Sequence, residues 1–172
     1  MANTQNRWSL EQSILNQAFA ERGNLRELRL APRVALERAL GQPIPAEIAV
    51  KVAFDRPRKI HQIVPHEGHA LLGSIEPPKG DAAISGLRGL AVATAYRAAT
   101  DAEFRDKLLA DATGLAKTGL SKLKLPDDLK IVVVQEDAHT IWLTVPLVGR
   151  PDSRSDRHGH RDHEDESAHK PD

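Results

Sequence analysis

Apolar residues recur at helical spacing through the first 40 residues. Between residues 9 and 22 the apolar side consists of Leu10, Ile14, Leu15, Ala18 and Phe19. Ser9 is a good N-cap, and Gln12 three positions later completes a capping box, so we predict that this helix begins at Ser9. Residues 24–40 continue the pattern, but Pro32 divides them into two short helices, because proline breaks a helix interior and suits a first turn.

Two later stretches have the pattern of β-hairpins. Residues 48–54 alternate apolar and polar or small side chains, and after a short turn residues 60–64 return as the expected partner strand. Residues 129–134 are almost continuously apolar, which is typical of a strand that is buried on both faces or central in a sheet. Residues 141–145 follow as the second strand of that hairpin.

Helical spacing returns between the hairpins, over residues 85–100. Asp101 then caps a further helix, whose apolar side includes Phe104 and Leu108. These two residues, together with Trp142 in the last strand, are our candidates for contact with a partner protein.

The order of helices followed by a hairpin thus occurs twice. Twenty residues separate Pro45 from Pro65, and twenty also separate Pro126 from Pro146. The helices upstream align only if two residues are inserted near positions 119–122. Self-similarity of this kind indicates a duplicated unit, here a pseudo-twofold domain. The matched positions are Ile48 with Leu129, Val50 with Ile131, Val52 with Val133, Asp55 with Glu136, Ile60 with Ile141 and Val64 with Val145.

These elements predict an α+β fold, in which two helix-and-hairpin repeats share a small antiparallel sheet with the helices outside. Isolated hairpins are marginally stable, which favours their joining. The first repeat covers residues 1–65, a linker covers 66–83, and the second repeat covers 84–149. Residues 150–172 contain no large apolar side chain, so we expect a disordered tail.

Composition excludes several classes of function. Lys plus Arg and Asp plus Glu are both 24, so the net charge is zero and no overall field favours nucleic acid. Without cysteine there is neither a disulfide nor thiolate catalysis nor a cysteine-ligated metal. The first 19 residues have no long apolar run, so we expect neither a secretory signal nor a membrane span, and a cytoplasmic location.

Candidate chemistry in the repeats is sparse. The sequence His66-Glu-Gly-His69 is one residue shorter than the H-E-x-x-H zinc motif, and its glycine favours a loop, so we interpret both histidines as solvated linker residues. His61 and His139 are single residues, for which ordinary polar roles are expected. We predict no catalytic residue and no tightly bound cofactor.

Half of the eight histidines lie in the tail, interleaved with carboxylates. Such a segment can bind Zn, Ni or Cu weakly, or can serve only as a solubilising tail. A zinc and nickel titration with and without the tail distinguishes these two hypotheses. The candidate ligands are His158, His160, His163 and His169.

The second repeat resembles a known family. The run DAEFRDKLLAD of residues 101–111, the Leu125-Pro126 pair and the hairpin LKIVVVQEDAHTIWLTVP are similar to the nitrile hydratase alpha-subunit domain. They are more similar to its non-enzymatic relatives, the nitrile hydratase leader-peptide family. The enzymes carry a C-T-L-C-S-C metal loop after the second strand, where this chain has Val-Pro-Leu-Val-Gly-Arg at residues 145–150. Nitrile hydration by the family mechanism is therefore not expected.

The resemblance implies a non-catalytic recognition module, or the precursor of a ribosomally made and enzymatically modified peptide, which docks a modifying enzyme or exporter protein. As a core peptide, however, the tail lacks Cys, Thr and a Gly-Gly or Ala-Gly cleavage site. Two alternatives stay open: an accessory protein that carries a transition metal on its tail, and an enzyme subunit without the metal loop. Partners are expected to be proteins, with a homodimer left open, and neither nucleic acid nor membrane.

Overall fold

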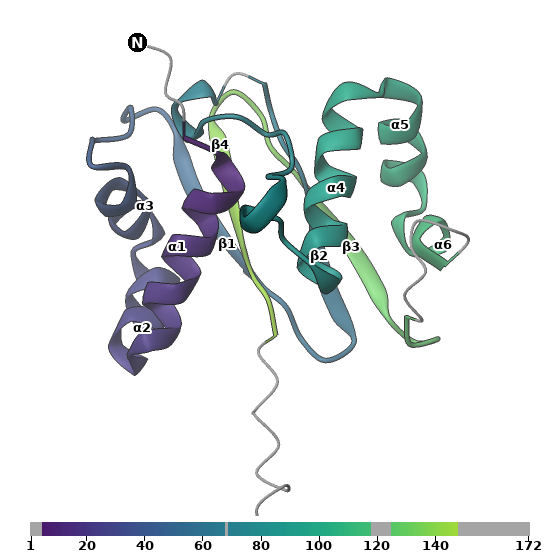
Figure 1. The fold of residues 1–172 in the computed structure, drawn as a ribbon, viewed down its shortest axis with the longest axis horizontal. Coiled ribbons are helices and arrows are strands. Elements are labelled where there is room, and N and C mark those ends of the chain that lie inside the picture. Colours follow the sequence, from purple (N-terminus) through teal and green to yellow (C-terminus); the bar gives the residue numbers. More distant parts are fainter. Residues whose placement is uncertain (1–4, 68, 118–124, 148–172) are drawn as a thin grey trace, which may run out of the picture.

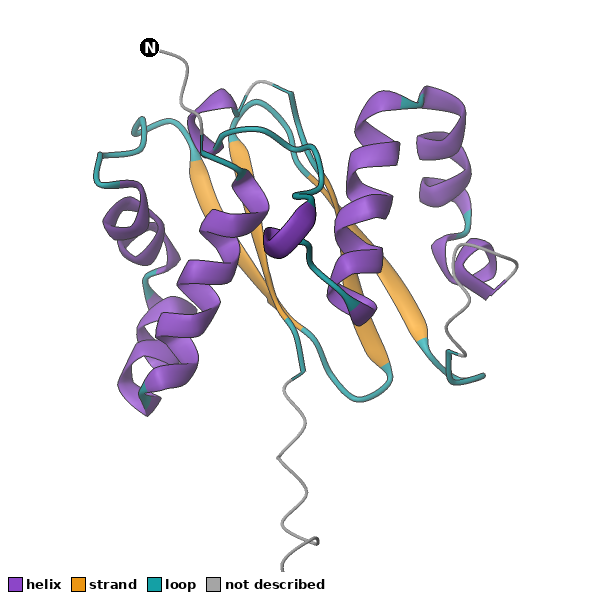
Figure 2. Ribbon diagram, viewed as in Figure 1, coloured by secondary structure: helices purple, strands orange, loops and turns teal. Residues whose placement is uncertain are grey.

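The computed structural model describes residues 5–67, 69–117 and 125–147, and its architecture is α+β as predicted (Figures 1 and 2). Three helices and two strands occur in the same order in each half. The helices are α1 (Arg7–Ala20), α2 (Arg22–Leu30), α3 (Pro32–Leu40), α4 (Gly86–Thr100), α5 (Ala102–Ala110) and α6 (Ala112–Lys117). The strands are β1 (Ala49–Phe54), β2 (Lys59–Val64), β3 (Lys130–Gln135) and β4 (Thr140–Val145), and two 3-10 turns are η1 (Ala70–Leu72) and η2 (Gly80–Ala82).

The strands pair between the halves and not within them. β1 runs parallel to β4, with Ala49 opposite Thr140, and β2 runs parallel to β3, with Lys59 opposite Lys130. The predicted antiparallel sheet, in which each hairpin keeps its own two strands as partners, is therefore wrong. Alternation along a strand indicates which side chains share a face, but it does not specify the neighbouring strand. Parallel pairing becomes possible because long helical connections separate the paired strands.

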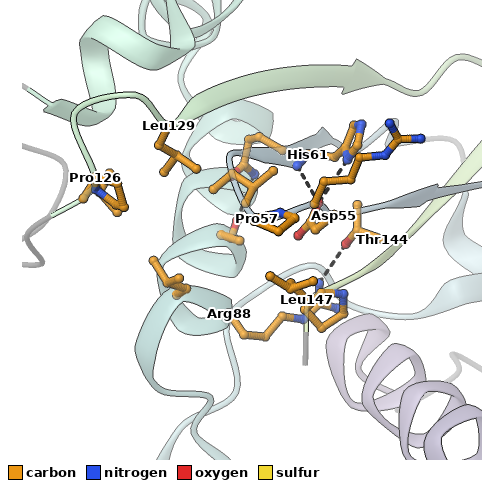
Figure 3. Close-up of a pocket in the computed structure, with 15 residues that line it drawn as sticks. Asp55, Pro57, His61, Arg88, Pro126, Leu129, Thr144 and Leu147 are labelled. Atoms are coloured by element: carbon orange, nitrogen blue, oxygen red, sulfur yellow. Dashed lines mark hydrogen bonds and ion pairs between the residues drawn. The ribbon is translucent and has the colours of Figure 1, made fainter. Parts of the chain in front are cut away.

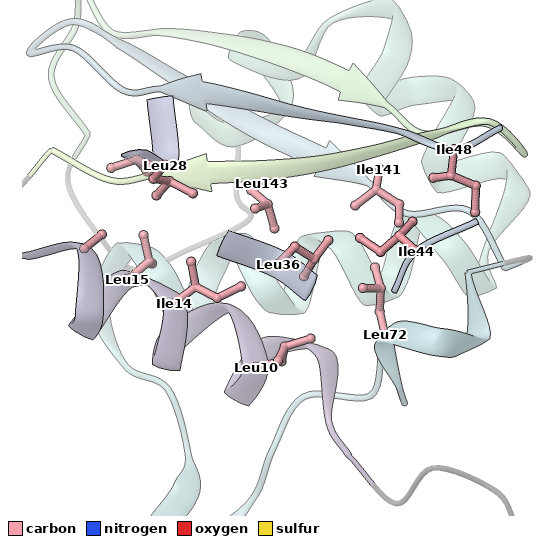
Figure 4. Packing of buried hydrophobic residues seen from close by; sticks show 12 residues of the cluster. Leu10, Ile14, Leu15, Leu28, Leu36, Ile44, Ile48, Leu72, Ile141 and Leu143 are labelled. Atoms are coloured by element: carbon pink, nitrogen blue, oxygen red, sulfur yellow. The ribbon is translucent and has the colours of Figure 1, made fainter. Parts of the chain in front are cut away.

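Each half supplies helices to one of the two strand pairs (Figure 1). Side chains of α1, α2 and α3 pack on Ile141, Leu143 and Val145 of β4, as Figure 4 shows for the first two strand residues. On the other side, α4, α5 and α6 pack on β2 and β3. β3 is only partly buried, so the prediction of burial on both faces is wrong for this strand, and β4 is the more buried one.

Local signals explain where three of the six described helices begin. Pro32 opens α3, and the Asp101 side chain accepts a hydrogen bond from the Phe104 backbone N–H at 3.0 Å, both as predicted. The N-cap of α1 is Asn6, three residues before the predicted Ser9, because the Asn6 side chain accepts hydrogen bonds from the N–H groups of Trp8 and Ser9. Ser9 therefore lies inside the first turn.

The segment predicted as a linker packs against the first helix. Leu72 is 1% exposed and belongs to the core beneath α1. The Trp8 indole N–H donates to the Ile75 carbonyl at 2.7 Å, and the Arg7 backbone N–H donates to the Ser74 carbonyl at 2.9 Å. Composition rich in proline and glycine indicates irregular backbone, but it does not show whether that backbone is buried.

Among the described helices, none combines the length and the apolar character that crossing a lipid bilayer requires.

Candidate functional site

Each half places a carboxylate directly after its first strand, Asp55 after β1 and Glu136 after β3. Both accept a hydrogen bond from the backbone N–H six residues later. His61 donates to Asp55 Oδ1 at 2.8 Å, and Trp142 donates to Glu136 Oε1 at 2.9 Å. The two carboxylates are therefore equivalent positions of the duplicated unit.

The Glu136 carboxylate is buried and closed off. Arg7 binds it with both terminal nitrogens, at 2.8 Å and 2.6 Å, and the His66 backbone N–H donates to it at 3.0 Å. Arg7 is 1% and Glu136 is 3% exposed. Burial alone would raise the pKa of Glu136, but the hydrogen bonds and charge of Arg7 outweigh it and hold that pKa below its usual range.

A chain of ion pairs extends from this closed site to the fourth helix. Arg7 Nε donates to Glu11 Oε1 at 3.0 Å, and Arg88 of α4 donates to Glu11 Oε2 at 2.5 Å. Arg88 also donates to the Thr144 hydroxyl at 2.9 Å. The network thus joins both halves of the molecule through groups that are almost entirely shielded from water.

Asp55 has a different environment, although its position is equivalent. Its Oδ1 faces the His61 backbone N–H and, at 3.0 Å, the His61 ring Nδ1. Arg88 lies near enough to act on its charge, but the hydrogen bonds of Arg88 go to Glu11 and Thr144. Burial raises the pKa of Asp55, against the opposing effects of His61 and Arg88. The folded protein therefore holds this carboxylate in its charged form at a cost in stability.

This cost gives a pH-dependent prediction for Asp55→Asn. A raised folded-state pKa means that Asp55 favours folding below its unfolded pKa and disfavours it once pH has risen through the folded value. We expect Asp55→Asn to raise the melting temperature at pH 7, with the gain shrinking in acid, where the wild-type carboxyl is protonated too. Thermal unfolding between pH 3 and pH 7 measures this, and a loss of stability at pH 7 would contradict it.

A pocket of about 360 Å³ opens beside Asp55 (Figure 3). This volume is within the range of small-ligand sites. The pocket lies between β2, the first turns of α4, the loop before β3 and the chain after β4. Its polar lining includes Asp55, His61, Arg88 and Thr144, and its apolar walls include Ile60, Leu87, Leu125, Leu129 and Leu147.

Two features of the pocket favour a ligand. Leu87 and Leu147 are 53% and 54% exposed, so both leucines lie at its mouth with half of their surface in water. Within the described part of the chain, the Nε atom of Arg88 is the buried side-chain nitrogen or oxygen that has no hydrogen-bond partner. Unsatisfied buried groups are uncommon and often mark functional sites, and this N–H donor calls for an acceptor, such as a carbonyl oxygen of a bound polypeptide.

The residues predicted to contact a partner are dispersed. Phe104 and Leu108 are 4% and 1% exposed and pack in the core between α5 and β2, so the native fold does not present them to a partner. Trp142 is partly exposed, and the Lys51 ammonium lies 5.5 Å from its ring centroid. Partner contact through Trp142 stays a prediction. None of the three residues lines the pocket.

The predicted histidine sites have different outcomes. His69 is 4% exposed, and its Nε2 lies 2.7 Å from the Asp137 carbonyl and 3.0 Å from the Thr140 carbonyl, so its interpretation as a solvated residue is wrong. His61 has the ordinary polar role expected of it, in the pair with Asp55. Within the residues that the structure describes, no group of three or more His, Asp or Glu side chains is arranged to hold a metal ion. The tail ligands His158, His160, His163 and His169 lie outside the described residues.

One sequence signal could have located the pocket. The separation of 81 residues that relates Asp55 to Glu136 also relates Arg7 to Arg88. An alignment with two residues inserted upstream of the strands does not match Arg7 with Arg88. With the single separation kept, the sequence indicates two equivalent pairs of an arginine and a carboxylate, Arg7 with Glu136 and Arg88 with Asp55, and the structure shows that they differ. Comparison of the chain with family models, with curated proteins and with solved structures found no match in any of the three.

Proposed function

We propose that the chain is a non-catalytic recognition module of the leader-peptide kind, which docks a modifying enzyme or an exporter protein. Its docking site is the pocket between β2 and α4. The observation that carries this proposal is an apolar cavity with two half-exposed leucines, Leu87 and Leu147, at its mouth.

The energetics of such a cavity suit an anchoring side chain. Burying one large apolar side chain yields about 1.5–3 kcal/mol. Protein interfaces concentrate their binding energy in a few side chains that fill pockets of this kind. The partner's anchor would also cover Leu87 and Leu147, which lose contact with water only when something docks there.

The polar lining supports recognition over catalysis. The Thr144 hydroxyl accepts a hydrogen bond from Arg88 and is not paired with His61, so the described lining residues do not form the pair of nucleophile and adjacent base that covalent catalysis needs. The Asp55 and His61 side chains face each other. Their arrangement suits the binding of a polar group at the end of an apolar anchor.

Charged substitutions at the mouth of the pocket test the proposal. We expect Leu87→Asp and Leu147→Asp each to weaken binding to a modifying enzyme or exporter protein taken from the neighbouring genes at least tenfold, about 1.4 kcal/mol. Leu30→Asp is the matched control, because Leu30 is 70% exposed and lies on α2, away from the pocket. Isothermal titration calorimetry measures the affinities. Equal affinities for all three variants, or no binding by the wild type, would overturn the proposal.

A further inference from the structure

The lining of the pocket also indicates which side chain of a partner would fill it. We propose that it accepts an arginine side chain of the partner polypeptide, with the guanidinium group on Asp55 and the methylene chain along the apolar wall. This inference rests on the proposed function and specifies the ligand of the same site.

The first argument is a difference in hydrogen-bond donors between the two equivalent carboxylates. In the described part of the chain, four N–H groups donate to Glu136: two from the Arg7 guanidinium and one each from the His66 and Trp142 backbones. Among the described residues, the Asp55 carboxylate is contacted only by His61, through its backbone N–H and its ring. A carboxylate can accept about four hydrogen bonds, so Asp55 has capacity for a ligand.

The 81-residue separation identifies the residues that would take the places of the Arg7 and His66 donors beside Asp55. The residue equivalent to Arg7 is Arg88, whose terminal nitrogens bind Glu11 and Thr144. The residue equivalent to His66 is Leu147, and no described hydrogen bond joins its backbone N–H to Asp55. Asp55 thus lacks the guanidinium that closes the other half, and a guanidinium from outside would restore the same pairing.

Charge favours a cation over an anion. The two equivalent sites together hold three acidic groups, Glu11, Asp55 and Glu136, and two basic groups, Arg7 and Arg88. Arg88 is already neutralised by Glu11 at 2.5 Å. Arg56 also lines the pocket, but it is exposed, so water and salt screen its charge. Among the described residues, no arginine or lysine side chain therefore binds the Asp55 carboxylate directly, and its polar contact is with His61.

Shape favours arginine among the cations. Its three methylene groups can lie against Ile60, Leu87 and Leu129 while the charged end reaches a polar group. The planar guanidinium binds a carboxylate through two parallel hydrogen bonds and is more weakly hydrated than an ammonium, so it enters a half-buried site at lower cost. Burial raises the pKa of Asp55 although His61 and Arg88 act in the opposite direction, so its present neighbours do not fully compensate the burial of its charge.

The test uses acetylated, amidated pentapeptides Ala-Leu-X-Leu-Ala, where X is arginine, lysine, citrulline or norleucine. Affinities for the full chain are measured by NMR from the backbone amide signals of Leu87, Ala91 and Leu147. We expect the arginine peptide to bind at least tenfold more tightly than the norleucine peptide, with lysine and the neutral citrulline between them. Asp55→Asn is expected to abolish the advantage of arginine and to leave norleucine binding unchanged.

The outcomes separate this inference from the proposed function. If the norleucine peptide binds as tightly as the arginine peptide, or Asp55→Asn changes neither, the arginine inference is wrong while the pocket still docks an apolar side chain. If no peptide shifts the pocket signals, both proposals fail. Melting curves of Asp55→Asn exclude unfolding as the cause of lost binding.

Discussion

Replacing Glu136 by leucine is expected to lower the free energy of unfolding by about 3–5 kcal/mol, the usual cost of removing one partner from a buried ion pair. Arg7 is 1% exposed and would keep its charge, since a guanidinium does not lose its proton in a protein. The backbone N–H groups of His66 and Trp142 would also lose their acceptor. Equilibrium unfolding in urea measures the loss.

Two controls make this prediction specific. Glu27→Leu removes the partner of Arg38 at the surface, where water replaces the lost contact, so we expect little change. The double variant Arg7→Met, Glu136→Leu removes both buried charges and is expected to cost less than the sum of the single substitutions. If Glu136→Leu were no more costly than Glu27→Leu, the network would not stabilise the fold.

The same network predicts the behaviour in acid. The pKa of Glu136 is lowered in the folded state, so its stabilisation is complete above the unfolded value, about 4.3, and is lost as pH falls through the folded value. Glu136→Leu lacks this contribution. Its free energy of unfolding should therefore vary less with pH below that value than the wild type's does.

Leu108→Ala is expected to cost about 2–5 kcal/mol, because it leaves a cavity among Val64, Ala98 and Phe104. Leu109, the next residue in α5, is 42% exposed, while Leu108 is 1% exposed. Leu109→Ala is therefore the matched control, and surface changes of this kind stay within about 0.5 kcal/mol. Urea unfolding of both variants measures the difference. Similar losses for the two leucines would contradict the packing of α5.

This pair also separates two roles for Leu108. A residue that binds a partner at the surface weakens binding when truncated but leaves the free energy of unfolding almost unchanged. Truncating a core residue lowers the free energy of unfolding. It weakens the apparent affinity only because a larger fraction of the protein is unfolded. Comparing both measurements on Leu108→Ala shows which role the residue has.

Helix and strand positions were largely predictable because they depend on residues close in sequence. Pro32 divides α2 from α3, and Asp101 caps α5, through groups at most a few positions away. The strands follow the alternation of apolar residues to within one residue of the expected bounds. The exception at α1 has the same kind of cause, since Asn6 competes with Ser9 for the capping position and offers its side chain to two N–H groups.

The candidate site was only partly predictable. The match of Asp55 with Glu136 was visible in the duplicated sequence, but nothing in it indicated that one carboxylate is closed by Arg7 and the other borders a pocket. That difference depends on contacts between α1, α4 and the turns after the strands, which lie far apart along the chain. The role of a single histidine was equally hard to predict. His69 contacts the carbonyl groups of Asp137 and Thr140, which lie about 70 residues away in the sequence.

By itself, then, the sequence determined the α+β class, the order of helices followed by two strands in each half, and some of the breaks and caps, such as Pro32 and Asp101. The tertiary structure decided that strands exchange partners between the halves, that Leu108 lies in the core, and that the pocket forms at Asp55. The reason is physical. Local hydrogen bonding and apolar periodicity act within a few residues, whereas strand pairing and burial depend on which distant surfaces meet.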